Sequence, residues 1–261
     1  MKIGFIGCGN MGGALARAVA GSGRAEVLLY DKDTERASAL AGEIGGSSAS
    51  FDAVAKCDYL FLGVKPNIIN GVLGELSSVI SNATVIISMA AGVAIEKITV
   101  GLGKGNPIIR IMPNTPAAYG CGMILYTASA NVSSEQINAF NEFMQPAGVL
   151  DNIPESLIDA GSAVSGCGPA FVYMFIEAMA DGGVAAGLPR DKAILYAAKT
   201  VLGAATTMLE SGKHPGALKD AVCSPGGSTI EGVLTLESGG MRGVVSDAVL
   251  AAYEKTKKLG K

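Results

Sequence analysis

The chain has 261 residues, of which 49% are apolar and 16% charged, and its formal net charge is −3. This length and composition suffice for two domains with buried cores. The small net charge gives no electrostatic reason to expect a nucleic acid or an anionic membrane as partner. The first apolar run continues into a glycine-rich segment rather than a signal cleavage site, and residues 83–95 are too few to span a bilayer. These features predict a cytoplasmic protein.

The chain has five cysteines, at positions 8, 57, 121, 167 and 223, and a single histidine. The number of cysteines is odd, and no two of them have the Cys-x-x-Cys spacing of a metal or redox site. We therefore expect reduced thiols and no metal centre.

The N-terminus carries the most informative motif. An apolar run at residues 3–6 leads directly into Gly7-Cys8-Gly9-Asn10-Met11-Gly12, and apolar residues at helical spacing follow. A Gly-x-Gly-x-x-Gly motif between a strand and a helix is typical of a dinucleotide-binding turn, in which the helix N-terminus receives the pyrophosphate. The alternative is a glycine turn in some other α/β protein.

A second apolar run, residues 27–30, ends on Asp31. The acid lies about 20 residues beyond the last glycine, where the dinucleotide motif places a ribose-binding carboxylate. Such a carboxylate favours NADH, because it repels the 2′-phosphate of NADPH. Lys32 and Arg36 follow closely and could instead fold over that phosphate. We expect either NADH or NADPH to serve, with a modest preference for NADH.

Further strands are predicted at residues 59–64, 85–88, 108–112 and 123–126, with helices between them. This alternation is typical of an α/β domain with a doubly wound parallel sheet of the Rossmann type. Three of these strands end on loops that would border a shared cofactor cleft at the carboxyl edge of the sheet. The candidate loop residues are Val64, Lys65, Pro66, Ala91, Gly92 and Asn114.

After residue 153 the strand pattern stops, and the rest of the chain has Ala, Gly and Leu at helical spacing, with helix starts at Pro169 and Pro189. We predict a Rossmann domain over residues 1–153 and an all-helical domain over residues 154–261. Helices at 191–209 and 241–259 carry long apolar stripes that a second subunit would cover. The alternative is a bundle that buries them within one chain.

Two glycine-rich segments, 165–169 and 224–229, open helices in this half. Bare N–H groups at a helix start, with hydroxyls beside them, can receive a carboxylate without a cationic side chain. The second segment offers Ser224, Gly227, Ser228 and Thr229 for this purpose. The alternative is that the hydroxyls only cap the helix.

Together these motifs resemble the pyrroline-5-carboxylate reductase family. The segments at 7–12, 64–66, 112–116, 165–171 and 224–230 occur in the order found in that family, and the resemblance spans nearly the whole chain. It implies an oxidoreductase of proline biosynthesis that reduces L-1-pyrroline-5-carboxylate to L-proline with NADPH or NADH. It also implies a C-terminal dimerisation domain and a homodimer, often assembled into rings such as a homodecamer. By resemblance, Ser50 lies on the adenosine side of the cofactor, and Ser162 is the candidate for steadying the substrate nitrogen.

The chain departs from the family pattern at Cys167 and Phe171, where a serine and a tyrosine are usual. One alternative function is a β-hydroxyacid dehydrogenase, but these enzymes carry a lysine that is missing between Pro169 and Gly187. Another imine reductase and a nonenzymatic dinucleotide sensor are further alternatives. The single histidine, His214, is expected in a loop without a catalytic role.

Overall fold

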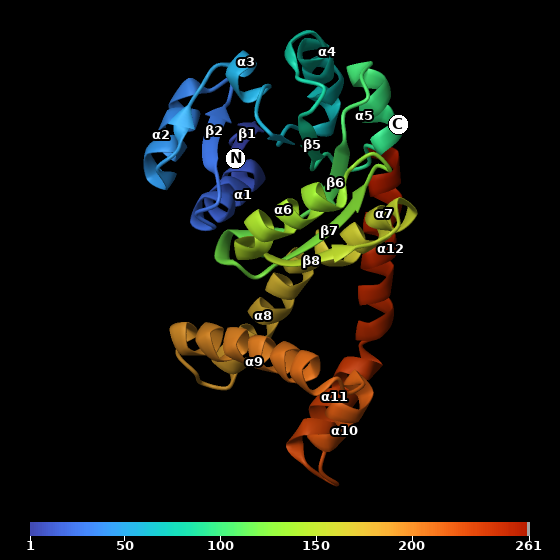
Figure 1. Cartoon of the computed structure of the whole chain (residues 1–261). Helices are drawn as coiled ribbons and strands as arrows, with labels where there is room; N and C mark the ends of the chain where they lie inside the picture. The colour runs from blue at the N-terminus through green and yellow to red at the C-terminus, as the bar shows by residue number, and fades with distance from the viewer. Residues whose placement is uncertain (260–261) are drawn as a thin grey trace. The chain divides into compact units, whose positions relative to one another are not determined.

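The computed structural model describes residues 1–259 of the chain, shown in Figure 1. Its contacts divide the chain into two compact units. Unit 1 comprises Met1–Cys167 and the last turns of the C-terminal helix, and unit 2 comprises Gly168–Leu250. The strands end before residue 153, the expected domain boundary, whereas the contacts place one further helix with unit 1. Each unit is described by itself below.

Unit 1 contains a sheet of eight strands in the order β3-β2-β1-β4-β5-β6-β7-β8. The six strands from β3 to β6 form the doubly wound order of a Rossmann fold, with all their pairs parallel. The strands are β1 (Lys2–Ile6), β2 (Glu26–Tyr30), β3 (Ser47–Ser48), β4 (Tyr59–Leu62), β5 (Val85–Ser88), β6 (Ile108–Met112), β7 (Gly122–Ala128) and β8 (Gly148–Asn152).

The helices of this unit follow the strands in sequence. They are α1 (Asn10–Gly21), α2 (Thr34–Ile44), α3 (Phe51–Val54), α4 (Ile69–Val79), α5 (Ile95–Leu102), α6 (Ser134–Met144) and α7 (Glu155–Ser165), with short 3₁₀ turns at Pro66–Ile68, Thr115–Tyr119 and Gln145–Ala147. A capping box of Ser133 and Gln136 starts α6.

Helices cover both faces of the sheet (Figure 1), and the inner strands β4, β5 and β6 are fully buried. On one face, α1, α2 and α6 pack around the stacked rings of Phe5 and Phe61, whose centroids are 4.3 Å apart. On the other face, α3, α4 and α5 pack over Leu60, Leu62 and Ile86. The glycine-rich turn after β1 is therefore attached to a rigid core.

The predicted Rossmann-type sheet is confirmed, with one refinement of strand direction. Strand β7 runs antiparallel to β6, and β8 then pairs with β7 in parallel. The chain can reverse here because the connection between β6 and β7 is a short 3₁₀ turn, and an antiparallel neighbour needs no crossover helix. The two-residue strand β3 and the edge strand β8 were not predicted as separate elements.

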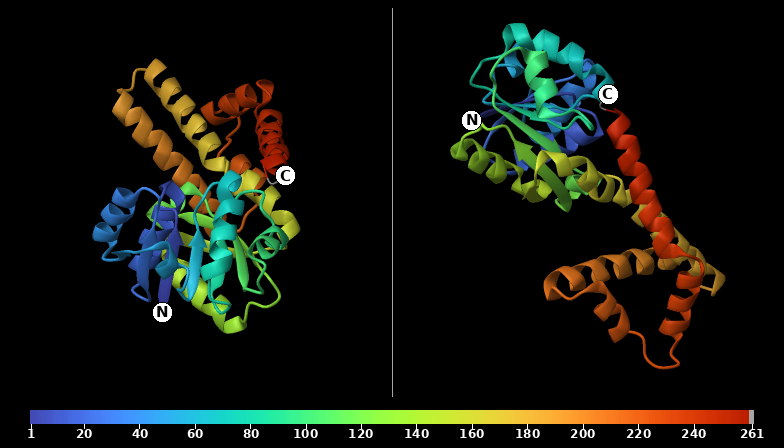
Figure 2. Two further views of the ribbon diagram at one scale, coloured as in Figure 1. Left: turned by 90° about the horizontal axis from the view of Figure 1, so that it is seen from above. Right: turned by 90° about the vertical axis from the view of Figure 1, so that its right-hand side faces the viewer.

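Unit 2 is all-helical, as expected. Its elements are α8 (Gly168–Ala185), α9 (Arg190–Ser211), α10 (Pro215–Ala221), α11 (Ser228–Ser238) and most of α12 (Met241–Leu259). Helices α8 and α9 lie side by side (Figure 2) and bury only small residues between them, namely Ala180, Ala193 and Ala197. Pro189 is the residue before α9 rather than its first residue.

Large apolar side chains remain exposed on this unit. Met174 of α8 is 69% exposed, Tyr196 of α9 is 54% exposed and Leu209 at the end of α9 is 75% exposed. The helices of unit 2 therefore do not bury their apolar stripes as a self-sufficient bundle would.

Within the described residues, one helical stretch, Glu155–Ala185, is long and apolar enough to cross a membrane by length and composition. It is longer than the apolar run at 83–95, and it consists of α7 and α8, which are separated at Gly166 and Cys167. A core helix of a soluble protein passes the same test, so this stretch alone does not indicate a membrane protein.

Candidate active site

The glycine-rich loop after β1 has the geometry of a phosphate-binding turn. Gly7 has a φ of 97°, and a Cβ there would lie 2.5 Å from the carbonyl oxygen of Gly63. A Cβ on Gly12 would lie 2.1 Å from the carbonyl oxygen of Gly7, so both glycines are needed for backbone packing. A Cβ on Gly9 would meet no atom within 4 Å. The loop is thus closely packed against backbone at Gly7 and Gly12 and has free space beside Gly9.

Helix α1 begins at Asn10, directly after Gly9, and no side chain of the described residues caps it. The N–H groups of its first turn, which includes Met11 and Gly12, have no carbonyl partner inside the helix. They present donors and the positive end of the helix dipole, which suit an anion such as a pyrophosphate.

Asp31 ends β2 and is fixed against this loop. Its Oδ2 accepts a hydrogen bond from the Cys8 N–H at 2.7 Å, and its Oδ1 accepts one from the Asp33 N–H at 3.0 Å. Arg36 approaches the same carboxylate at 3.6 Å and pairs with Asp33 at 3.0 Å. Each carboxylate oxygen has more than one acceptor position. Asp31 can therefore orient the glycine loop and still accept from a ribose hydroxyl.

A cavity of about 290 Å³ lies beside the loop. It brings together predicted cofactor residues that lie far apart in the sequence, namely Gly7, Gly9, Asp31, Val64 and Lys65. Tyr30 and Phe51 also line it, with their rings edge to face and their centroids 5.3 Å apart. These two aromatic residues were not singled out from the sequence.

The cavity wall carries three cations, on Lys32, Arg36 and Lys65, and two acids, Asp31 and Glu75. Lys65 is exposed and precedes the 3₁₀ turn that begins at Pro66. An excess of cations around an open glycine loop suits a ligand that carries phosphate groups. The residues present therefore fit a nicotinamide dinucleotide.

Three other predicted cofactor residues, Ser50, Ala91 and Gly92, do not line this cavity. The Ser50 hydroxyl caps α3 by accepting from the Ala53 N–H at 3.3 Å. Ala91 and Gly92 are half-buried in the loop that follows β5, where Gly92 has a φ of 72°. These three positions stay predictions.

Asn114 is 8% exposed, and both ends of its amide are used within the protein. Its Nδ2 donates to the carbonyl oxygen of Ser165 at 2.9 Å, and its Oδ1 accepts from the Met123 N–H at 2.9 Å. The side chain thereby joins the loop after β6 to β7 and to the end of α7. A direct cofactor contact of Asn114 stays a prediction.

Ser162 is on α7 and is only 6% exposed. Helix α7 lies close to β7, because a Cβ on Gly161 would be 2.3 Å from Cδ1 of Leu125. On the same helix, Glu155 and Asp159 both pair with the buried Arg110 of β6. The sequence analysis missed this ion cluster, although an arginine inside the apolar strand Ile-Ile-Arg-Ile-Met was a usable signal.

In unit 2, Gly227 is the residue before α11, and no side chain among residues 1–259 caps this helix. Ser224, Ser228 and Thr229 are exposed around its start. A Cβ on Gly227 would lie 2.4 Å from Oγ of Ser224. The first N–H groups of α11 therefore lack a side-chain partner, and their use in binding a carboxylate stays a prediction.

His214 precedes α10, and its Nδ1 accepts from the Gly216 N–H at 3.1 Å.

All five cysteines are free. Burial raises the pKa of the Cys8 thiol to about 11, and the Asp31 carboxylate beside it acts in the same direction. Cys8 is therefore a neutral thiol within the glycine loop and not a nucleophile.

The sequence matches two family models. Residues 2–92 match a family described as NADP oxidoreductase coenzyme F420-dependent, and residues 155–259 match one described as pyrroline-5-carboxylate reductase dimerisation. These matches cover the glycine loop with its cavity and the helical part of the chain.

Similarity to individual proteins extends over the full chain. The pyrroline-5-carboxylate reductase of Escherichia coli (strain K12) is 43% identical over 265 residues, covering 100% of this chain and 98% of the relative. The structure of the Plasmodium falciparum pyrroline carboxylate reductase with NADP bound is similar with a TM-score of 0.89 and 33% identity, covering 100% of this chain and 98% of that one. The structure of the Streptococcus pyogenes 1-pyrroline-5-carboxylate reductase is similar with a TM-score of 0.90 and 33% identity, covering 99% of this chain and 98% of that one. The chain belongs to the pyrroline-5-carboxylate reductase family.

Proposed function

We propose that this protein is an NAD(P)H-dependent reductase that converts L-1-pyrroline-5-carboxylate to L-proline, the last step of proline biosynthesis. The observation that carries the proposal is the combination of two sites in one family member. Unit 1 holds a glycine loop open to a pyrophosphate at Gly9, and unit 2 holds an uncapped helix start suited to a small carboxylate. A dinucleotide sensor would have no need of the second site.

The nicotinamide nucleotide, when bound, supplies the hydride that reduces the C=N bond of the cyclic imine. The α1 N-terminus and the N–H groups of the glycine loop hold the pyrophosphate, with Asn10 and Met11 in the first turn. Asp31 orients the loop through Cys8 and accepts from the adenosine ribose. Lys65, with Val64 and Pro66, borders the phosphates. Ala91 and Gly92, which lack bulky side chains, border the nicotinamide ring.

The substrate carboxylate is held by the start of α11, through the Gly227 backbone and the hydroxyls of Ser224, Ser228 and Thr229. Ser162 steadies the ring nitrogen. A cyclic imine is readily protonated in water, so the chain need not supply a proton to the nitrogen. Catalysis then depends mainly on orienting the imine carbon toward the hydride donor.

We propose that the two nucleotides are both used and that Asp31 gives NADH a modest advantage. The carboxylate is fixed by two backbone N–H groups, and its side chain is 12% exposed. Arg36 is 52% exposed and is already paired with Asp33, so it is less well placed to bind a 2′-phosphate.

The dimerisation domain makes the protein an oligomer, and we propose a homodimer as its unit, with a homodecamer as a further assembly. The exposed apolar side chains of α8 and α9 support this, since a second subunit would cover them. Sedimentation that shows a folded monomer at micromolar concentration would contradict the dimer.

We also propose a cytoplasmic enzyme without nucleic-acid or membrane partners, and a functional boundary at 153/154.

The enzymatic proposal is tested by following nucleotide oxidation with pyrroline-5-carboxylate, using NADH and NADPH separately. We expect turnover with both. A reverse assay with 3-hydroxyisobutyrate and NAD⁺ or NADP⁺ serves as the control, in which we expect none. A folded sample that binds nucleotide but does not turn over pyrroline-5-carboxylate would refute the proposal.

A further inference from the structure

Arg110 lies in the middle of β6, in register with Ser88 of β5 on one side and Thr127 of β7 on the other. Its neighbours Ile109 and Ile111 point into one apolar layer, so the arginine points to the opposite face of the sheet. There it is only 3% exposed. A guanidinium at such a position costs stability unless acids pair with it.

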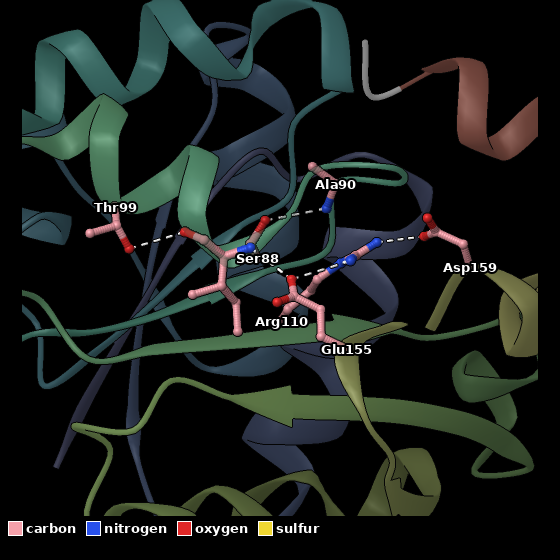
Figure 3. Close-up of polar contacts among 7 residues, drawn as sticks. Ser88, Ala90, Thr99, Arg110, Glu155 and Asp159 are labelled. Atoms are coloured by element: carbon pink, nitrogen blue, oxygen red, sulfur yellow. Dashed lines mark hydrogen bonds and ion pairs between the residues drawn. The ribbon is translucent and has the colours of Figure 1, made fainter. Parts of the chain in front are cut away.

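Two carboxylates of α7 provide that pairing (Figure 3). Nη1 of Arg110 donates to Oε1 of Glu155 at 3.3 Å, and Nη2 donates to Oδ1 of Asp159 at 2.5 Å. The two acids are four residues apart and therefore share one face of the helix. Nε of Arg110 is buried and has no partner within residues 1–259. An apolar residue would avoid the free-energy cost of burying a charged group with an unpaired N–H, so stability alone does not account for an arginine here.

Glu155 connects the arginine to a second element. The same Oε1 accepts a hydrogen bond from the Ile95 N–H at 2.8 Å, at the first residue of α5. Helix α5 follows Ala94, which offers no capping side chain, so the carboxylate of α7 caps it from outside. Figure 3 shows Arg110, Glu155 and the turn of Ser88 and Ala90 close together. The end of the loop that contains Ala91 and Gly92 is thereby tied to α7.

Helix α7 is held at both ends from the same strand and its following loop. Arg110 pairs with its first two turns, and the Asn114 amide donates to the carbonyl oxygen of Ser165, its last residue. Ser162 is three residues beyond Asp159 and so lies on the face that Arg110 engages. The ion cluster therefore fixes the rotation of α7 about its axis and, with it, the position of Ser162.

We propose that Arg110 is a positioning residue for hydride transfer. Through Glu155 and Asp159 it holds two parts of the site in one arrangement, the loop of Ala91 and Gly92 and the Ser162 face of α7. The role rests on the proposed function, in which these parts border the nicotinamide ring and the substrate nitrogen. Lysine cannot replace arginine here, because a single ammonium lacks the fork that reaches both carboxylates.

The test is a single-turnover measurement of NADH oxidation by pyrroline-5-carboxylate, with enzyme in excess over NADH. Its first-order rate constant reports the chemical step and does not depend on the fraction of folded enzyme, as long as folded enzyme stays in saturating excess over NADH, which sets the amplitude. For Arg110→Lys we expect a rate constant about 10- to 100-fold lower, because a small misplacement of reacting groups has effects of this size. The dissociation constant of ADP-ribose should change less than twofold, since the glycine loop is untouched.

Arg24→Lys is the matched control, because Arg24 forms an exposed ion pair with Glu142 in the same unit, at 2.7 Å. We expect its rate constant to equal that of the unaltered protein. Asp159→Asn keeps the Arg110–Glu155 pair and should lower the rate constant in the same direction by a smaller factor. This variant tests the positioning role of Arg110 if Arg110→Lys does not fold.

A rate constant within twofold of the unaltered protein in Arg110→Lys, or in Asp159→Asn where only that variant folds, would overturn the positioning role. An equal loss in Arg24→Lys would overturn it too. Absence of turnover in the unaltered protein would instead refute the proposed function, and the positioning role with it. Failure of the positioning role is thus measured on the variants, and failure of the proposed function is measured on the unaltered protein.

Discussion

Gly9→Ala separates a binding role of the glycine loop from a structural one. At Gly9 the backbone has φ −68° and ψ −167°, which alanine adopts freely, and the added Cβ would meet no atom within 4 Å. The free energy of unfolding should therefore stay level or rise by about 0.4–1 kcal/mol, because alanine restricts the unfolded chain. The methyl group would occupy space that a pyrophosphate needs. Losing one hydrogen bond to a charged group costs about 1.5–3 kcal/mol, or roughly a 10- to 100-fold weaker affinity.

The affinity can be measured by titration with NADH, using the fluorescence of the nucleotide, since the chain contains no tryptophan. Thermal unfolding of the same samples reports stability. Gly21→Ala is the matched control, because Gly21 ends the same helix and its added Cβ also meets no atom within 4 Å. If Gly9→Ala bound NADH within twofold of the unaltered protein, the loop would not contact the pyrophosphate and the reasoning would fail.

Three further predictions concern other parts of the molecule. Replacing Asp31 by Ser should raise the ratio of the NADPH to the NADH specificity constants, and a level or lower ratio would mean that Asp31 does not face the ribose. Thr229→Val should raise the KM for pyrroline-5-carboxylate by about 10- to 100-fold, from a loss of about 1.5–3 kcal/mol, and leave the KM for the nucleotide unchanged. The opposite pattern would remove α11 from the substrate site. Burial raises the pKa values of Cys8 and Cys57 to about 11 and that of Tyr59 to about 12, so these groups ionise more readily in the unfolded chain. Chemical denaturation should accordingly show full stability below about pH 9 and a falling free energy of unfolding toward pH 11, a slope that Cys8→Ala with Cys57→Ala should reduce.

Local patterns explain why so much of unit 1 could be predicted. A Gly-x-Gly-x-x-Gly turn needs a strand before it and a helix after it, and both could be recognised from the periodicity of the apolar residues. The direction of β7 could not be predicted, because it depends on pairing with β6 over a distance along the chain. Arg110 was missed because its two acids lie about 45 and 49 residues further on and meet it only in the folded sheet.

Asn114 illustrates a different limit. It lies between Pro113 and Pro116 at a predicted strand end and was a candidate for the cofactor cleft, whereas both ends of its amide bond to backbone groups of β7 and α7. A loop sequence indicates rigidity, but it does not say whether a polar side chain serves the protein or a ligand. In unit 2 the apolar stripes predicted helices correctly, while one sequence does not show what covers the apolar side chains that stay exposed.

The central claim is that the protein transfers hydride from a nicotinamide nucleotide to pyrroline-5-carboxylate. The most direct measurement uses NADH deuterated at the transferred position of C4 and identifies the product by mass spectrometry and NMR. We predict L-proline that carries one deuterium at C5, in an amount equal to the NADH oxidised. Oxidation of NADH without proline, or proline that carries no deuterium, would contradict the account.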